Sequence, residues 1–185
     1  MNLPLPVAVG LWVAVGVVLL LLILGGRRRL TQRTGQLVPQ PPAAPADLGA
    51  PRLGPLEATY VSTTLAGDWL ARVGAHGLGD RAAATVTVHD AGVLVERAGA
   101  PTVFLPADAL RGAGLAPGMA GKYVGADGLV VLTWLAPSDG RVRAVELDTG
   151  LRTRHPADKS RLVDAVRHLL AAPGEAADPL QKENP

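Results

Sequence analysis

The sequence contains no cysteine, which excludes disulfide bridges and thiolate metal sites and leaves the redox compartment open. Aromatic residues are also scarce, at 3% of the 185 residues. Proteins that bind single-stranded nucleic acid stack bases on several aromatic rings, and this chain has few to provide. An excess of one charge is missing too, because segment 57–170 carries twelve basic and twelve acidic residues. A surface that neutralises DNA phosphates is not expected, and we predict no nucleic-acid partner.

The residue spacings that mark metal sites and hydrolytic active sites are absent as well. None of the four histidines lies in an H-x-E or H-E-x-x-H pattern. None of the three serines lies in a G-x-S-x-G motif, so no catalytic triad can be proposed. These residues are His76, His89, His155, His168, Ser62, Ser138 and Ser160. We predict no catalytic residue, no metal ligand and no cofactor, and hence a protein that is not an enzyme.

One glycine-rich stretch, GAGLAPGMAGKY from Gly112 to Tyr123, resembles part of a phosphate-binding loop. A Walker-type loop needs G-x-x-x-x-G-K-[ST], in which the lysine reaches the phosphates and the hydroxyl holds Mg²⁺. Gly121 and Lys122 fit this pattern, but Ala116 replaces the first glycine and Tyr123 replaces the hydroxyl residue. We interpret Lys122 as a solvated loop charge that precedes a strand.

Two further patterns have structural explanations that we prefer to functional ones. Gly77-Leu78-Gly79 is half of a dinucleotide-binding fingerprint and lacks the third glycine. Glu146 and Asp148 share one face of a predicted strand, as an acid/base pair would. We interpret them as the solvated edge of a strand that ends in a turn at residues 148–150.

The chain has one long apolar run, Val7–Leu24, which contains no charged residue. About 20 apolar residues suffice to span a bilayer, and on an insertion scale this run contributes on the order of −5 kcal/mol. A cleaved signal peptide is the alternative, but its basic n-region is missing and Arg27–Arg29 follow the run directly. We predict a transmembrane helix at residues 3–26. By the positive-inside rule, the protein is expected to cross the plasma membrane once, with its N-terminus outside and the rest cytoplasmic.

Composition divides the remainder into three parts. Residues 27–56 combine a basic juxtamembrane segment with a Pro/Ala-rich stretch, which we expect to form an extended linker, or stalk, between membrane and domain. Residues 57–172 are expected to form the folded domain. Residues 173–185 are polar, and we expect a disordered tail.

The pattern of the folded segment predicts a mainly β domain that ends in one helix. Short β-type runs alternate with turn residues roughly every ten positions, as in sandwiches and barrels. The predicted strands are 58–63, 69–75, 83–89, 92–97, 102–105, a run around 111–115, 128–135 and 141–147. In the segment 156–170, apolar residues then recur at helical spacing. They are Leu162, Val163, Val166, Leu169 and Leu170.

Three stretches together resemble a known family. They are ATVTVHDAGVLVERAGAPTVFLPADALRGAGLAPGMAGKYV, GLVVLTWL and ELDTGLRTRHPADKSRLVDAVRHL. The sequence is similar here to actinobacterial membrane-anchored proteins with a bacterial pleckstrin-homology-like (PH-like) domain. The resemblance implies a strongly bent antiparallel barrel of about seven strands, capped by a C-terminal α-helix and preceded by one transmembrane helix. An OB-type barrel is the alternative, and the helix in last place argues against it.

Two functions remain from the sequence. The favoured one is a non-catalytic interaction or scaffold module that is anchored in the bilayer through its N-terminal helix and binds a partner protein. The alternative is a domain that binds a lipid headgroup or another small ligand at the membrane surface. PH domains that grip lipid headgroups use basic residues in the loop between the first two strands. The region Thr64–Asp68 (TLAGD) has none, and the arginines that follow it are Arg72 and Arg81.

Overall fold

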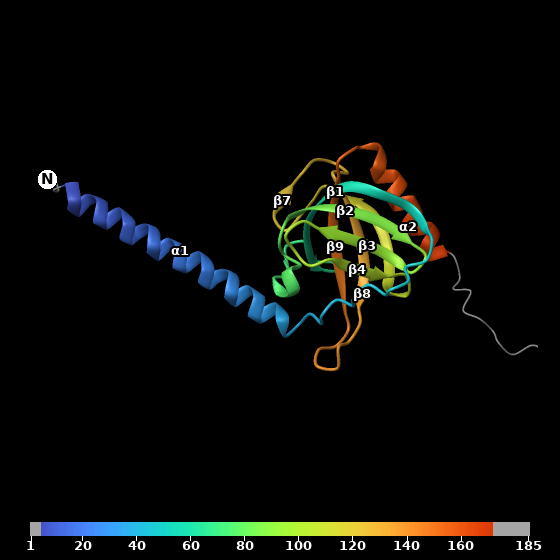
Figure 1. Ribbon diagram of the computed structural model, residues 1–185, viewed down its shortest axis with the longest axis horizontal. Coiled ribbons are helices and arrows are strands. Elements are labelled where there is room, and N and C mark those ends of the chain that lie inside the picture. The colour runs from blue at the N-terminus through green and yellow to red at the C-terminus, as the bar shows by residue number, and fades with distance from the viewer. Residues whose placement is uncertain (1–4, 172–185) are drawn as a thin grey trace, which may run out of the picture.

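The computed structural model describes residues 5–171. An N-terminal helix, α1 (Leu5–Gly35), projects from one side of a β domain, and a C-terminal helix, α2 (Ala157–Ala171), packs on it (Figure 1). The tail predicted to be disordered, 173–185, lies outside the described residues.

Seven strands form one antiparallel sheet in the order β4-β3-β2-β1-β9-β8-β5. They are β1 (Pro51–Leu65), β2 (Ala82–His89), β3 (Gly92–Arg97), β4 (Val103–Pro106), β5 (Leu110–Ala116), β8 (Leu129–Ala136) and β9 (Val145–Thr153). A separate hairpin consists of β6 (Gly118–Met119) and β7 (Lys122–Tyr123), and two 3-10 turns are η1 (Ala75–Gly77) and η2 (Ala107–Ala109). The architecture confirms the predicted fold class.

Strand β1 makes the sheet bend into a barrel. Residues 51–60 pair with β2, whereas residues 58–65 pair with β9. The register of β1 shifts between Leu53 and Leu56 against β2, and between Tyr60 and Ser62 against β9. Such irregularities bend a strand and increase its twist, so one long strand can belong to both halves of the barrel.

The core follows from alternation within the strands and from the helical period of α2. In β8, Val130, Leu132 and Trp134 are fully buried, while the residues between them are partly exposed. Helix α2 turns its apolar face onto the barrel, as predicted, except that Leu170 is exposed. Its buried apolar residues are Leu162, Val163, Val166 and Leu169. Each such side chain stabilises the fold by roughly 1.5–3 kcal/mol when it leaves water, so α2 is part of the core.

Two predicted strands differ in the structure. Residues 69–75 form a loop with one bridge, Thr64 to Arg72, because Asp68 Oδ1 accepts hydrogen bonds from the backbone N–H groups of residues 70 and 71. The strand predicted at 141–147 begins at Val145 and continues to Thr153. The turn predicted at 148–150 is therefore wrong. Those residues are paired on both sides, with β1 and with β8, and this non-local pairing overrides their local turn preference.

The predicted linker, 27–56, also differs. Helix α1 continues through the basic run to Gly35, and β1 begins at Pro51, six residues before the predicted domain start at 57. Between them, Val38 is 1% exposed and belongs to the core. The carbonyl groups of Leu48 and Ala50 accept backbone hydrogen bonds from the β2–β3 turn. The segment is extended, as proline favours, but it lies on the domain and does not form a stalk.

Helix α1 is long and apolar enough to cross a membrane. Its window Val9–Gly26 has a mean hydropathy of 2.6, and none of it is buried against the domain. A signal sequence has a similar length and composition, so these properties fit both a membrane anchor and a signal sequence.

Candidate binding groove

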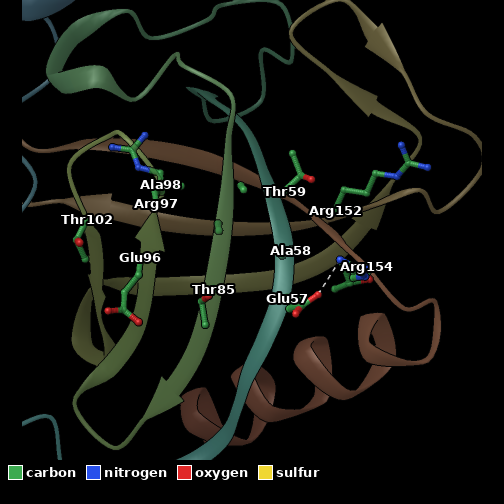
Figure 2. A pocket seen from close by; sticks show the side chains of 13 residues that line it. Glu57, Ala58, Thr59, Thr85, Glu96, Arg97, Ala98, Thr102, Arg152 and Arg154 are labelled. Carbon is green, nitrogen blue, oxygen red and sulfur yellow. Dashed lines mark ion pairs between the residues drawn. The ribbon is translucent and has the colours of Figure 1, made fainter.

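An open groove of about 910 Å³ lies on the outer face of the sheet. It crosses strands β3, β2, β1 and β9 (Figure 2). Its floor is made by short side chains in register. Thr85 lies opposite both Glu57 and Glu96, and Thr59 lies opposite both Ala83 and Arg152. Because alanine and threonine do not fill the space between the longer charged side chains, the face is hollow.

Charges of both signs line the rim. Glu96 lies on β3, and on the opposite side lie Arg152 on β9 and Arg154 directly after that strand (Figure 2). Arg154 Nη1 is 3.1 Å from Glu57 Oε2, and both side chains are about two-thirds exposed. Such exposed pairs contribute about 0–1 kcal/mol to stability. Arg152 forms no ion pair among the side chains that the structure describes. Among the described residues, Glu96 on one side of the groove and Arg152 on the other therefore remain without an ion pair and can meet complementary groups.

Arg97, which follows Glu96 on β3, also lines the groove and is 6% exposed. Its guanidinium carbon lies 4.4 Å from the centroid of the Tyr60 ring, within cation-π range. Nε donates to the carbonyl of Pro101 at 2.7 Å, and Nη1 donates to the carbonyl of Gly77 at 2.8 Å. Burial lowers the pKa of Arg97 below its ordinary value. Arg97 fastens the β1–β2 loop and the β3–β4 loop to the barrel.

A chain of buried hydrogen bonds stands beneath Arg97. Trp134 Nε1 donates to Thr149 Oγ1 at 3.0 Å, and Thr149 Oγ1 lies 2.9 Å from Thr63 Oγ1. Thr63 Oγ1 lies 2.6 Å from the Tyr60 hydroxyl, which donates to the carbonyl of Leu78 at 2.8 Å. Tryptophan can only donate and a carbonyl can only accept, so every hydroxyl in the chain donates toward Leu78. This series of hydrogen bonds joins β8, β9 and β1 to the β1–β2 loop.

Burial raises the pKa of Tyr60 to about 12, although the hydrogen bond with Thr63 opposes this shift. The phenol stays protonated at physiological pH and keeps its donor role. We read this cluster as a structural support for the groove, because each of its hydroxyl groups is already engaged with a neighbour.

The structure does not bring the four histidines together. His76 Nε2 lies 3.0 Å from the carbonyl of Val38, and His89 Nδ1 lies 3.3 Å from the carbonyl of Gly49. His155 and His168 are exposed at the two ends of α2. Among residues 5–171, no group of three or more histidine, aspartate or glutamate residues is arranged to hold a metal ion.

The three serines engage the backbone. Ser138 and Ser160 are exposed, and their hydroxyls donate to the carbonyls of Val142 and Ala157. Ser62 is buried in β1, with its hydroxyl 3.5 Å from the next carbonyl. Each serine thus has a local structural role.

Lys122 is exposed in β7, and the segment that follows it leads into strand β8. A phosphate-binding loop would lead into a helix, so this hairpin has a different architecture. Gly77-Leu78-Gly79 lies at η1 and precedes β2, again without the helix of a dinucleotide site.

Glu146 and Asp148 do not form an acid/base pair in the structure. Glu146 is exposed, whereas Asp148 accepts hydrogen bonds from Thr133 Oγ1 at 2.7 Å and from the backbone N–H of Gly67 at 3.3 Å. Asp148 therefore secures the start of the β1–β2 loop on β8 and β9.

Sequence reasoning missed the groove. The alternation in AATVTVH places Thr85 on an outer face, and that signal was available. The groove forms because Thr85 lies between Glu57 and Glu96 on neighbouring strands, and Thr59 lies beside Arg152. These contacts depend on the order of the strands in the sheet, which the sequence pattern does not give.

Comparison with known families agrees with this architecture. Residues 38–167 match the model of a family described as bacterial PH domain-like. The match begins at Val38, the first buried residue of the segment that packs on the barrel, and ends within α2. No curated protein matches the chain.

Proposed function

Because the chain belongs to the bacterial PH domain-like family, we propose that it is a non-catalytic interaction module anchored in the plasma membrane by α1. The uncharged apolar window Val9–Gly26 supports the anchor. The basic run Arg27–Arg29, directly after it, supports a cytoplasmic domain and an external N-terminus.

The groove on the outer face of the sheet is the proposed contact surface for a partner protein. The observation that carries this proposal is the unpaired Arg152, which lies across a floor of short side chains from Glu96. A partner segment can lie over Thr59 and Thr85 while its acidic residue meets Arg152 and its basic residue meets Glu96. The hydrogen-bonded strands beneath form a preorganised floor, which reduces the entropy that binding would cost.

Binding of a lipid headgroup is the second candidate, and the arrangement of arginines favours it less. Arg72 Nε donates to the carbonyl of Gly79 at 2.9 Å, so that arginine is committed within its own loop. The preceding residues, Thr64–Asp68, carry no basic side chain. On the groove rim, Glu57 and Glu96 balance the charges of Arg152 and Arg154. An anionic phosphate would therefore meet a surface of mixed charge.

Photocrosslinking in living cells tests the groove. A photoreactive residue is introduced at Thr85 in the full-length protein, and a matched variant carries it at the exposed Ser160 on α2. We expect a discrete protein adduct from the Thr85 position that is absent from the Ser160 position. The substitution Arg152→Glu should remove the adduct because it reverses the basic side of the groove.

The proposal would be contradicted if both positions gave the same adducts, or if Arg152→Glu left the Thr85 adduct unchanged. Adducts only with lipid at Thr85 would favour headgroup binding instead. Circular dichroism of the purified variants controls for folding, since Thr85 is partly exposed and Arg152 is exposed.

A further inference from the structure

A second surface, away from the groove floor, exposes large apolar side chains. Trp69 is 56% exposed and Leu70 is 59% exposed, at the tip of the β1–β2 loop. Leu115 in β5 is 44% exposed and Tyr123 in β7 is 75% exposed. The backbone N–H of Ala120 donates to the carbonyl of Trp69 at 2.7 Å and so joins this loop to the β6–β7 hairpin. We call Trp69, Leu70, Leu115 and Tyr123 the apolar face.

The apolar face is hollowed by a concavity of about 360 Å³. Its lining contains two aromatic rings, those of Trp69 and Tyr123, and no charged residue. Around them lie Ala116, Pro117, Gly118 and Gly121. Exposed apolar surface in such a concentrated form marks a contact site, because scattered single residues are the ordinary pattern.

The loop that carries Trp69 and Leu70 is also the loop that receives the end of α1. The backbone N–H of Gly74 donates to Thr34 Oγ1 at 3.1 Å, and His76 Nε2 lies 3.0 Å from the carbonyl of Val38. Figure 1 shows β7 on the side of the domain from which α1 projects. The apolar face and the anchor therefore belong to one end of the domain.

Helix geometry sets the distance between the apolar face and the bilayer. The apolar window ends at Gly26, and α1 continues as a helix past Thr34. Eight residues of helix rise about 12 Å. Trp69 is only five positions before Gly74 in the sequence, so the apolar face lies within reach of the interfacial layer beside the span.

We propose that the apolar face docks on the lipid interface next to α1 and gives the domain a second contact with the membrane. This inference rests on the proposed membrane anchoring. Tryptophan and tyrosine favour the membrane–water interface because their rings are apolar and their N–H and O–H groups remain hydrated. Two contacts would fix the orientation of the domain, and with it the direction in which the groove opens.

The absence of native cysteine makes a direct test available. Single variants Leu70→Cys, Tyr123→Cys and Leu170→Cys of the full-length protein carry a nitroxide label in vesicles of phosphatidylcholine and phosphatidylglycerol. Leu170 is a matched control, because it is also an exposed apolar residue but lies at the end of α2. The measurement is the accessibility of each label to oxygen, which concentrates in lipid, and to a water-soluble nickel complex.

The ratio of oxygen to nickel accessibility should be several-fold higher at residues 70 and 123 than at residue 170. Adding Trp69→Ser to the residue 123 variant should lower its ratio toward the control value. A nickel accessibility equal to that of the control would overturn the proposal. Low accessibility to both reagents would also overturn it, because that result indicates contact with a second copy of the chain.

Carbonate extraction of the same vesicles separates the two proposals. If the protein resists extraction while its labels face water, anchoring stands and docking of the apolar face is wrong. If carbonate releases the protein, anchoring itself is wrong, and the docking proposal falls with it.

Discussion

The buried hydrogen-bond chain from Trp134 to Leu78 offers a quantitative test of how the barrel holds its β1–β2 loop. The substitution Thr149→Val removes the central hydroxyl and leaves a side chain of nearly the same shape. Trp134 Nε1 then loses its acceptor, 3.0 Å away, and the Thr63 hydroxyl loses its donor, 2.9 Å away. Thr149 is 0% exposed, so water cannot replace it without a structural change.

The expected loss can be worked from the groups that are left without partners. A buried donor without an acceptor costs about 1–3 kcal/mol, and each lost hydrogen bond contributes a further ~0.5–1.5 kcal/mol. Because valine fills the same volume, no cavity term is added. We expect Thr149→Val to lower the free energy of unfolding by about 2–4 kcal/mol. For a domain of this size, that corresponds to a decrease of at least ~6 °C in the midpoint of thermal unfolding.

Thermal unfolding of the full-length protein in detergent, followed by tryptophan fluorescence, measures this decrease. The matched variant Thr149→Ser keeps the hydroxyl and loses one methyl group, which costs about 1 kcal/mol. If Thr149→Val were no less stable than Thr149→Ser, the hydrogen-bond chain would not contribute as argued.

Three further results are expected. Replacing Arg72 and Arg81 together by alanine should leave binding of the protein to anionic liposomes unchanged in flotation assays, and a large loss would instead favour headgroup recognition. Gly92→Ala should destabilise the domain by at least ~1 kcal/mol more than Gly99→Ala in the same unfolding assay. A Cβ at residue 92 would lie 2.2 Å from a backbone oxygen, whereas one at residue 99 would face open space. Equal losses of stability in the two variants would refute this reasoning. A side-chain hydrogen bond from an arginine of β1 lowers the pKa of Asp90 below 3.8, so its stabilising contribution is present above that pH and is lost as the pH falls through the lower folded-state value. The stability difference from Asp90→Asn should disappear in strong acid, and a difference independent of pH would contradict the linkage.

Local patterns were sufficient to predict several elements. The bounds of β3 are those predicted, 92–97, because Asp90-Ala91-Gly92 marks the turn before it. Helix α2 follows from the apolar period of Leu162 and Val166, which one face of a helix brings together. In both cases the deciding residues lie within one turn or one helix of each other.

Other elements depend on partners that are distant in the sequence. Glycine is typical of turns, but β9 continues through Gly150 because β1 and β8 pair with this residue from either side. Met119 lies where a side chain at residue 150 would stand, with its sulfur 2.7 Å from the position of a Cβ, and this close approach explains the glycine. The linker differs for a similar reason, since only the barrel provides the site that buries Val38.

The groove and the apolar face were beyond prediction for the same reason. In the sequence, Arg152 is an ordinary polar residue of an alternating strand. Its place in the groove, opposite Glu96, depends on the strand order, in which β2 and β1 lie between β3 and β9. Trp69 was predicted at the start of a strand, 69–75. In the structure Asp68 forms a turn that leaves the ring 56% exposed.

The location of the domain in the cytoplasm is central to the proposed function, and one labelling measurement tests it directly. A single cysteine at Ser160, which is exposed on α2, is treated with a membrane-impermeant maleimide in intact cells and in permeabilised cells. The account predicts no labelling in intact cells and full labelling after permeabilisation. Equal labelling in intact cells would place the domain outside and would contradict the proposed function.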